Sequence, residues 1–314
     1  MNNLINVSII IINYKTPQLV IDCVNSIVEK TNNLNYEIIV VDNNSEDNSK
    51  DIIERYLDGQ IIFIESKENL GFGTGNNLGV QYARGEYLFF LNSDTVLINN
   101  AIKILYDYMI SHKEVGIVGG NLYTIDLKPS PSFSMSFDKI EDYKDNSKWL
   151  TILKNKLFRH KQKKNIVFND TDEPLKVGYV YGTDMMMKKK LFDDIHGFDS
   201  DFFMYAEEED LSYRVVESGK EIWSIPDARI IHLDGGSSIS NNKFNSKHFK
   251  MRLHGGFIYF KKRLGNEGIE KYYKYRKRLF VRDRLIAKLL HRTNTVKIRD
   301  EHIKCIEEVY QNVK

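Results

Sequence analysis

The first 120 residues alternate between short apolar runs and longer segments with apolar residues at helical spacing. The apolar runs are rich in β-branched and aromatic residues and predict strands over residues 7–12, 37–41, 61–64 and 87–91. Apolar residues that recur every three or four positions predict helices over residues 19–28, 48–57, 74–83 and 99–111. Strands that alternate with helices at this spacing indicate parallel β-α-β units.

The pattern weakens between residues 124 and 176 and then returns. This stretch is rich in Ser, Lys, Asp and Asn and predicts irregular structure, with one helix near residues 149–158. Further strands and helices are predicted over residues 177–181, 188–195, 207–217, 221–225 and 228–232. After about residue 245 the chain is expected to be helical. The sequence therefore predicts an α/β fold, with a mostly parallel central sheet flanked by helices and a helical C-terminal extension.

The composition is that of a soluble globular protein. The 314 residues include 42% hydrophobic and 28% charged side chains, and no stretch approaches the roughly 20 consecutive apolar residues of a transmembrane helix. The N-terminus lacks a basic segment before its short apolar run, which argues against a signal peptide and predicts a cytoplasmic protein. Cys23 and Cys305 lie far apart in sequence, so neither a disulfide framework nor a zinc site is expected.

The net charge of +2 conceals a basic C-terminal region. Residues 247–314 hold 19 Lys/Arg against 7 Asp/Glu, and over residues 269–292 aromatic and aliphatic side chains alternate with Lys and Arg. Such a pattern is typical of an interfacial helix on anionic lipid. A basic helix that packs on the acidic body of the chain or on a second subunit is the alternative. Nucleic acid would match the charge, but no other feature supports it.

Polar side chains follow the predicted strands at their carboxyl ends, where parallel sheets bind ligands. Asn92, Ser93 and Asp94 follow the strand over residues 87–91, and their oxygens suit a hard divalent cation that would neutralise the diphosphate of a nucleotide-sugar. A polar turn is the alternative. Asp42 follows the second strand, where its carboxylate would accept a hydrogen bond from a base or ribose, or cap a turn.

A glycine-rich turn is expected before the helix over residues 74–83. Residues 68–77 (ENLGFGTGNN) would present backbone N–H groups to a phosphate. They do not form the dinucleotide fingerprint G-x-G-x-x-G, because Asn76 and Leu78 stand where glycine is required. No Gly-Lys-Ser/Thr of a P-loop follows. An ordinary flexible turn remains the alternative.

Four consecutive acidic residues begin the helix predicted over residues 207–217, directly after an aromatic cluster. The helix dipole favours acidic groups at this end, which accounts for one or two of them. A carboxylate beside aromatic side chains can have a raised pKa, and it would suit a general base that deprotonates a sugar hydroxyl. His232 ends a later strand just before Gly235 and Gly236, so it is either a structural residue or one that faces a cleft.

In their order along the chain, these segments resemble family 2 glycosyltransferases of the GT-A fold, in the branch that contains bacterial rhamnosyltransferases. The resemblance covers residues 7–238 and rests on SIIIINYKT, VVDNNSEDNS, ENLGFGTGNN, LFFLNSDT, YGTDMMMKKKLFDDIHGFDSDFFMYAEEEDLSYRV and IIHLDGGSS. It implies a Rossmann-like GT-A domain with a nucleotide-sugar-binding half over residues 1–120. An acceptor-binding and catalytic half would follow over residues 121–245, and the basic helical region over residues 246–314.

The resemblance also implies the residues that hold the donor. The nucleotide-sugar would contact Asn13, Tyr14, Asp42, Asn69, Gly71, Phe72, Asn76, Asn92, Ser93 and Asp184, with Asp42 at the base. Gly182 and Thr183 would lie near the transferred sugar or the acceptor. Asp94 and His232 would hold Mg²⁺ or Mn²⁺, although Asn92 departs from the commoner Asp-x-Asp.

The implied reaction is a single displacement that inverts the anomeric carbon. Glu208 would remove the proton of the acceptor hydroxyl, with Glu207 and Glu209 as alternative bases and Arg214 as an ion-pair partner of this acidic segment. The metal would stabilise the leaving diphosphate. The resemblance therefore implies an inverting, metal-dependent hexosyltransferase.

The resemblance further implies the partners. The expected donor is dTDP-L-rhamnose, with a UDP-sugar as the alternative. The expected acceptor is a glycan or a polyprenyl-diphosphate-linked sugar of a bacterial surface polysaccharide, reached at the inner face of the cell membrane. A homodimer is a further expectation. A sugar-1-phosphate nucleotidyltransferase is disfavoured because NYKTPQ lacks a glycine-rich, arginine-bearing loop. A non-catalytic module that binds nucleotide-sugar or glycan remains open.

Overall fold

The computed structural model describes residues 4–144, 167–233 and 244–314. The chain divides into two compact units. The first, here called the α/β unit, comprises Met1–Phe137, Ile166–Phe203 and Glu207–Ile239, and the second, the helical unit, comprises Asp138–Asn165, Met204–Ala206 and Ser240–Lys314. The helix predicted near residues 149–158 lies outside the described residues.

A mixed sheet forms the centre of the α/β unit. Its strands lie in the order β3 (Ile62–Glu65), β2 (Tyr36–Asp42), β1 (Val7–Asn13), β4 (Tyr87–Asn92), β10 (Asp184–Lys188), β6 (Val115–Tyr123), β11 (Glu221–His232) and β5 (Thr95–Leu97), and β8 (Leu175–Lys176) also pairs with β11. β1, β2, β3, β4, β6 and β11 run in one direction, and β5, β8 and β10 run in the other. A small second sheet pairs β7 (Phe133–Ser134) with β9 (Tyr179–Val180). The predicted mostly parallel sheet is confirmed.

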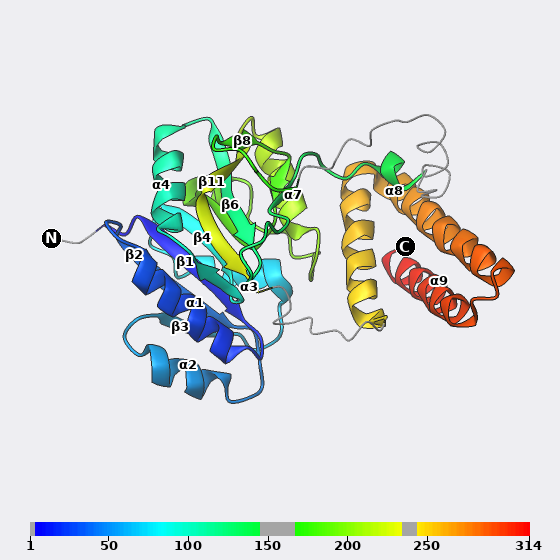
Figure 1. The fold of residues 1–314 in the computed structure, drawn as a ribbon, viewed down its shortest axis with the longest axis horizontal. Coiled ribbons are helices and arrows are strands. Elements are labelled where there is room, and N and C mark those ends of the chain that lie inside the picture. The colour runs from blue at the N-terminus through cyan, green and yellow to red at the C-terminus, as the bar shows by residue number, and fades with distance from the viewer. Residues whose placement is uncertain (1–3, 145–166, 234–243) are drawn as a thin grey trace. The chain divides into compact units, whose positions relative to one another are not determined.

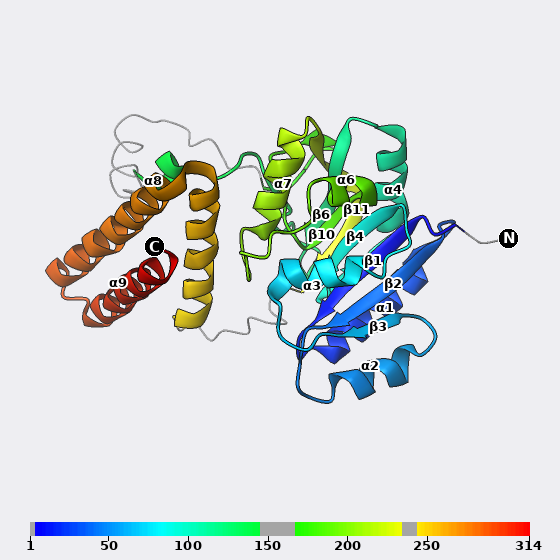
Figure 2. The ribbon, with the colours of Figure 1, turned by 180° about the vertical axis from the view of Figure 1, so that it is seen from behind.

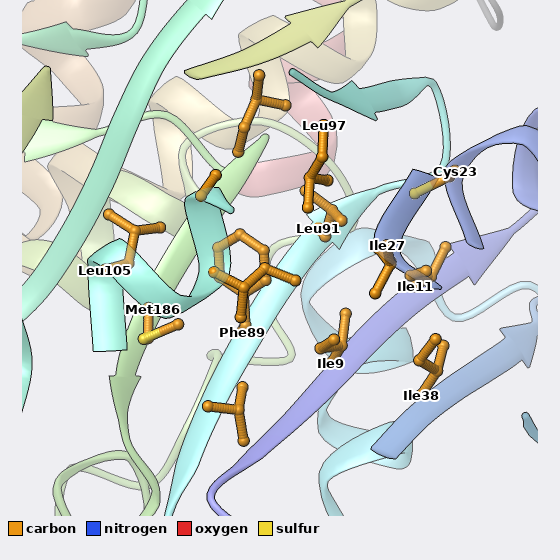
Figure 3. Packing of buried hydrophobic residues seen from close by; sticks show 14 of the residues in the cluster. Ile9, Ile11, Cys23, Ile27, Ile38, Phe89, Leu91, Leu97, Leu105 and Met186 are labelled. Carbon is orange, nitrogen blue, oxygen red and sulfur yellow. The ribbon is translucent and has the colours of Figure 1, made fainter. Parts of the chain in front are cut away.

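Helices cover both faces of this sheet. One face carries α1 (Pro17–Lys30), α2 (Ser49–Leu57) and α4 (Ala101–Ser111), as Figure 1 shows. The other carries α3 (Gly71–Val80), α6 (Lys189–Asp194) and α7 (Glu207–Glu217), as Figure 2 shows. Alternate strand residues point to opposite faces, so Ile9 and Ile11 pack in one hydrophobic cluster and Ile10 in the other. In the first cluster Phe89 of β4 lies among Ile9, Leu91 and Leu105 (Figure 3).

The strands and helices predicted within the first 120 residues are present, but several later strands were not predicted. β10 has the sequence DMMMK, in which Met carries little strand preference. β6 contains three glycines, which weaken a strand signal. The fold requires one of them because a Cβ at Gly120 would lie 2.4 Å from the carbonyl oxygen of Ala228. The two strands predicted over residues 221–225 and 228–232 form one strand, β11, with a register shift between Ile225 and Arg229.

The helical unit contains η1 (Ile140–Tyr143), α8 (Ser246–Leu289) and α9 (Thr293–Val313). Gly265 interrupts α8 with a φ of 63°, a conformation that glycine adopts most readily. Aromatic rings fill the unit: the buried Phe257 lies edge-on to Tyr272, and the half-buried Tyr273 of α8 stacks on Tyr310 of α9. Among the described helices, none combines the length and the apolar character that crossing a bilayer would need.

His302 of α9 lies in an aromatic pocket, and this should give it a distinct titration. Its ring stacks on Phe280 with centroids 4.4 Å apart, and Phe244 and Phe249 also pack against it. Burial lowers the pKa of His302. The neutral ring is therefore favoured in the folded state, so stability is complete above the ordinary pKa of about 6.5 and decreases as the pH falls below it.

We expect the NMR titration of the His302 ring to have its midpoint below the ordinary histidine value of about 6.5. A His302→Gln variant identifies the resonance. A midpoint at or above about 6.5 would contradict this prediction.

Candidate functional site

The carboxyl ends of three adjacent parallel strands bring the predicted nucleotide-binding residues to one edge of the sheet. Asn13 at the end of β1 lies opposite Asp42 of β2, and Ile12 lies opposite Asn92 of β4. Neighbouring strands are about 4.8 Å apart, so the ends of β2 and β4 are separated by roughly 10 Å. This edge is where ligands of such sheets bind.

Hydrogen bonds fix the Asp42 carboxylate. Oδ1 accepts from Asn13 Nδ2 (2.6 Å) and from Ser45 Oγ (2.6 Å), and Oδ2 accepts from the Ser45 backbone N–H (3.0 Å). Asn13, Asp42 and Ser45 are buried, whereas the Tyr14 side chain beside them is exposed. Asp42 thus has the turn-capping role that was the alternative prediction. The turn holds the Asp42 carboxylate in one orientation.

The glycine-rich segment is not a loop, because α3 begins at Gly71. The predicted helix therefore starts three residues too late. Close packing explains the glycines: a Cβ at Gly73 would lie 2.9 Å from Phe198 Cβ, and one at Gly79 would lie 2.6 Å from a methyl of Ile10. Sequence alone did not separate this packing role from a phosphate-binding turn.

The start of α3 is tied to neighbouring segments. Asn43 donates from Nδ2 to the Gly71 carbonyl (2.9 Å), and its Oδ1 accepts from the Leu70 N–H (2.8 Å). The Gly71 N–H donates to Asn69 Oδ1 (3.0 Å), and the Phe72 N–H donates to the Phe203 carbonyl (3.0 Å). These two N–H groups of the expected phosphate cradle are therefore already occupied.

The Asn76 side chain donates to the Phe72 carbonyl (3.0 Å), so it stabilises the first turns of α3. Asn77 holds the following loop: its Nδ2 donates to the Phe198 carbonyl (2.7 Å), and its Oδ1 accepts from the Phe198 N–H (3.0 Å). Asn43, Asn77 and Phe203 were not singled out from the sequence. The only sequence signal for such a role was the repeated occurrence of Asn beside glycine over residues 68–77.

The acidic segment begins α7, as predicted, and its four side chains differ in environment. Glu207, Glu209 and Asp210 are buried, whereas Glu208 is half-buried. Asp210 Oδ2 accepts from Arg214 Nε (2.8 Å), so the expected pairing of Arg214 with this segment is confirmed. Arg214 Nη1 also donates to the Ile195 carbonyl (2.6 Å).

Glu207 and Glu208 are electrostatically distinct. Burial, and then the charge of Glu208, raise the pKa of Glu207 well above its ordinary value. Glu207 Oε2 has no hydrogen-bond partner among the described residues. Glu208 lies beside Gly182 and Phe72, because a Cβ on Gly182 would be 3.5 Å from Glu208 Cβ and 3.2 Å from the Phe72 ring.

The predicted metal residues meet at the ends of β4 and β11. Asp94 Oδ1 lies 3.3 Å from His232 Nε2, and the Leu233 N–H donates to the Asp94 carbonyl (2.9 Å). The backbone of Asn92 at the end of β4 donates to the Thr183 carbonyl (2.9 Å). The segment that starts β10 is thereby joined to the predicted metal-binding motif.

Asp184 is fully buried at the start of β10. Its Oδ2 accepts from the Gly120 N–H (2.5 Å), and its Oδ1 has no hydrogen-bond partner within the described ranges. Burial raises the pKa of Asp184 to about 8, although the Gly120 N–H and the charge of His232 act in the opposite direction. In the pairing of β10 with β4, Asp184 lies opposite Leu91, three residues before Asp94.

The donor atoms fit a divalent cation that also binds a substrate. The described residues contain no cluster of three or more His, Cys, Asp or Glu side chains arranged to hold a metal. Asp94 and His232 would supply two ligands, and Asp184 Oδ1 is a buried oxygen without a hydrogen-bond partner among the described residues. Mg²⁺ is commonly bound by one or two carboxylates together with substrate phosphates and water. The residues therefore fit a metal held jointly with a diphosphate.

Comparisons with known proteins identify relatives of this chain. Residues 8–195 match the family described as "Glycosyl transferase family 2". The chain is 31% identical over 122 residues to the glycosyltransferase GlyG of Streptococcus pneumoniae, covering 38% of this chain and 40% of that protein. It is 27% identical over 246 residues to the rhamnosyltransferase WbbL of Escherichia coli K12, covering 75% of this chain and 87% of that protein. The match to an uncharacterized glycosyltransferase of Methanocaldococcus jannaschii covers 50% of that protein, so two of these relatives are matched over half their length or less.

A solved structure shares the fold. GalNAc-T7 with UDP, GalNAc and Mn²⁺ superposes with a TM-score of 0.61 at 15% sequence identity, covering 98% of this chain and 57% of that one. At this identity the similarity concerns the fold alone.

Proposed function

Because this chain belongs to glycosyl transferase family 2 and has the GT-A fold, we propose that it transfers a sugar from a nucleoside-diphosphate sugar to a glycan acceptor. The observation that carries this proposal is that the end of β4, the end of β11 and the start of β10 lie together. They bring the Asp94–His232 pair, the buried Asp184 and the segment from Gly182 beside Glu208 to one side of the sheet. The Asp94–His232 pair suits a cation that binds a charged leaving group, and Glu208 suits removal of a proton.

Asp42 and Asn13 would bind the nucleoside. Their hydrogen bonds hold the Asp42 carboxylate at the sheet edge, where it would accept from the base or the ribose. Tyr14, Asn69, Gly71, Phe72, Asn76, Asn92, Ser93 and Asp184 complete the proposed donor site. Similarity to the rhamnosyltransferase WbbL favours dTDP-L-rhamnose as the donor, and a UDP-sugar is the second candidate.

Asp94 and His232 would hold Mg²⁺ or Mn²⁺. When bound, the cation would supply positive charge to the diphosphate as it leaves. The role of the protein is to place the Asp94 carboxylate and the His232 imidazole 3.3 Å apart, where β4 and β11 end. Asn92 replaces an acid at this point, so the diphosphate oxygens would contribute more of the coordination than in an Asp-x-Asp site.

Glu208 is the proposed catalytic base. The raised pKa of Glu207 favours its protonated form, whereas Glu208 is half-buried and more accessible to an acceptor hydroxyl. Glu208 accepts the proton of the acceptor hydroxyl, the hydroxyl oxygen bonds to the anomeric carbon, and the bond from that carbon to the diphosphate breaks. Attack from the side opposite the leaving group inverts the anomeric configuration. Glu209 is buried and is a weaker candidate.

The wider setting is also a proposal. Residues 1–120 would bind the donor, residues 121–245 the acceptor, and residues 246–314 would form a basic helical region. The acceptor would be a glycan on polyprenyl diphosphate, used in bacterial surface polysaccharide synthesis in the cytoplasm at the membrane, with a homodimer as one form of the enzyme. The alternative function is a nucleotide-sugar or glycan binding module without catalysis.

Calorimetry against dTDP-, UDP- and GDP-sugars tests the donor site. We expect one nucleotide class to bind in the presence of Mn²⁺, and its affinity to fall at least tenfold in excess chelator, because the diphosphate would lose its counter-charge. Asp94→Asn should reproduce that loss, whereas Asp126→Asn at an exposed position should not. Equal affinity with and without chelator would remove Asp94 from its proposed role. Tight binding without transfer to any acceptor would favour the binding module.

A further inference from the structure

The end of the α8–α9 hairpin exposes a cluster of large aliphatic side chains. Leu285, Ile286, Leu289 and Leu290 are exposed by 52%, 37%, 80% and 53%. Leu285 and Leu289 are four residues apart, as are Ile286 and Leu290, so the four side chains form one continuous stripe at the end of α8. We call these four residues the hairpin tip. Single exposed apolar residues are ordinary, but a contiguous group needs an explanation.

Much of the apolar pattern that precedes the hairpin tip has a different role. Ile269, Tyr272, Phe280 and Ala287 are buried inside the helical unit. They pack within the hairpin, as in the contact between Phe280 and His302 of α9. The stretch over residues 269–292 therefore does not present one long apolar face, and the exposed aliphatic surface is concentrated at its end.

Cations surround the hairpin tip. Lys288 and Arg292 are exposed in the same turn, and Lys297 is exposed on α9. No ion pair joins these three side chains to another described residue. Their neighbours are partly neutralised: Arg284 pairs with Asp300, and Arg282 with Asp283 (3.2 Å). The charge of Lys288, Arg292 and Lys297 is therefore available to an external anion.

A basic groove continues from the hairpin tip along α8. Its lining includes Lys271, Lys274, Lys277, Arg278 and Val281. Val281 and Arg278 precede Leu285 by four and seven residues, so they share its helix face. Within the groove Lys277 is paired with Glu307 of α9, and Glu270 accepts a hydrogen bond from Tyr310. Lys274 and Arg278 add further positive charge to the groove.

We propose that the hairpin tip docks on an anionic lipid bilayer, with its four aliphatic side chains in the interface and Lys288, Arg292 and Lys297 against the headgroups. Aliphatic side chains ringed by Lys and Arg have this chemistry, and the basic groove extends the electrostatic attraction. A second copy of the chain is the weaker occupant, because a stable protein interface buries roughly 800 Å² per partner and four side chains at a helix end offer only part of that area. This docking does not depend on the proposed catalytic function.

Vesicle flotation with the full chain tests the proposal. We expect binding to vesicles that contain phosphatidylglycerol, little binding to vesicles of phosphatidylcholine alone, and weaker binding in high salt. Leu285→Asp/Leu289→Asp should reduce binding at least tenfold, because each leucine loses its burial in the interface. Ile125→Asp, at a position 72% exposed in the α/β unit, should leave binding unchanged.

The basic residues need a separate control. Lys288→Glu should weaken binding to phosphatidylglycerol vesicles about fivefold or more, since each cation near such a surface contributes about 1 kcal/mol. Lys304→Glu makes the same charge change on α9, roughly 16 Å along the helix from Thr293, which exceeds the screening length in physiological salt. Its effect should be smaller.

Three outcomes would overturn the proposal: binding to neither vesicle, equal binding to both, or a dimer that Leu285→Asp/Leu289→Asp dissociates. Circular dichroism establishes that each variant is folded. Donor binding measured in solution stays informative whichever result is obtained.

Discussion

Replacing Glu208 with Gln is expected to reduce sugar transfer about 10²- to 10⁴-fold, the usual contribution of a general base. The amide keeps the size of the side chain but cannot take the proton of the acceptor hydroxyl. The donor would still bind, because Glu208 is not among the groups proposed to hold it. Single-turnover transfer and calorimetric donor affinity, measured on the same preparation, separate the two effects.

Glu217→Gln is the matched control, because it makes the same chemical change at an exposed position of the same helix. It should leave both measurements unchanged. If Glu208→Gln retained full activity while Glu207→Gln lost it, the base would be Glu207. If transfer by the unaltered protein were equally slow, the binding module would be the better description.

Replacing Gly71 with Ala is expected to damage both the fold around α3 and the proposed donor site. A Cβ at this position would lie 1.9 Å from the carbonyl oxygen of Phe203, and the φ of +76° is unfavourable for any other residue. The Phe203 carbonyl must move, and the hydrogen bond from the Phe72 N–H would be lost with it. We expect a large drop in the melting temperature and in donor affinity.

Gly59→Ala separates backbone strain from steric conflict. Gly59 has nearly the same φ, +72°, but nothing lies within 4 Å of a Cβ placed there. Its substitution should therefore cost only the left-handed backbone penalty of about 1–2 kcal/mol and leave donor affinity intact. Similar losses in the two variants would show that contact with Phe203 is unimportant.

Local patterns revealed the N-terminal half of the fold because both faces of its strands are buried. Runs such as Ile9 to Ile12 are apolar throughout, and the intervening helices have one apolar face. β10 and β6 gave no such signal. β10 is a methionine run, and in β6 Gly120 takes the place of a larger residue where the backbone of Ala228 approaches. The sequence of β6 alone does not show that Ala228 of the distant strand β11 will lie against it.

The same limit applies to the candidate site. The nearness of Asp94 and His232 was expected from a family resemblance, and their contact depends on the antiparallel pairing of β5 with β11, which no local pattern indicated. The glycines of α3 look alike in sequence, yet Gly71 meets a backbone carbonyl and Gly73 meets Phe198. The different environments of Glu207 and Glu208 arise from burial, which four identical neighbouring charges do not reveal.

The position of β10 also affects how the protein is made. This strand, residues 184–188, lies between β4 and β6, which precede it by more than sixty residues. On the ribosome, β4 and β6 therefore emerge long before the strand that joins them. Until then the β4 backbone has an open edge beside Phe89 and Phe90, a surface that promotes aggregation. The nascent chain therefore carries this open edge from the synthesis of Asn92 until Lys188 has been added.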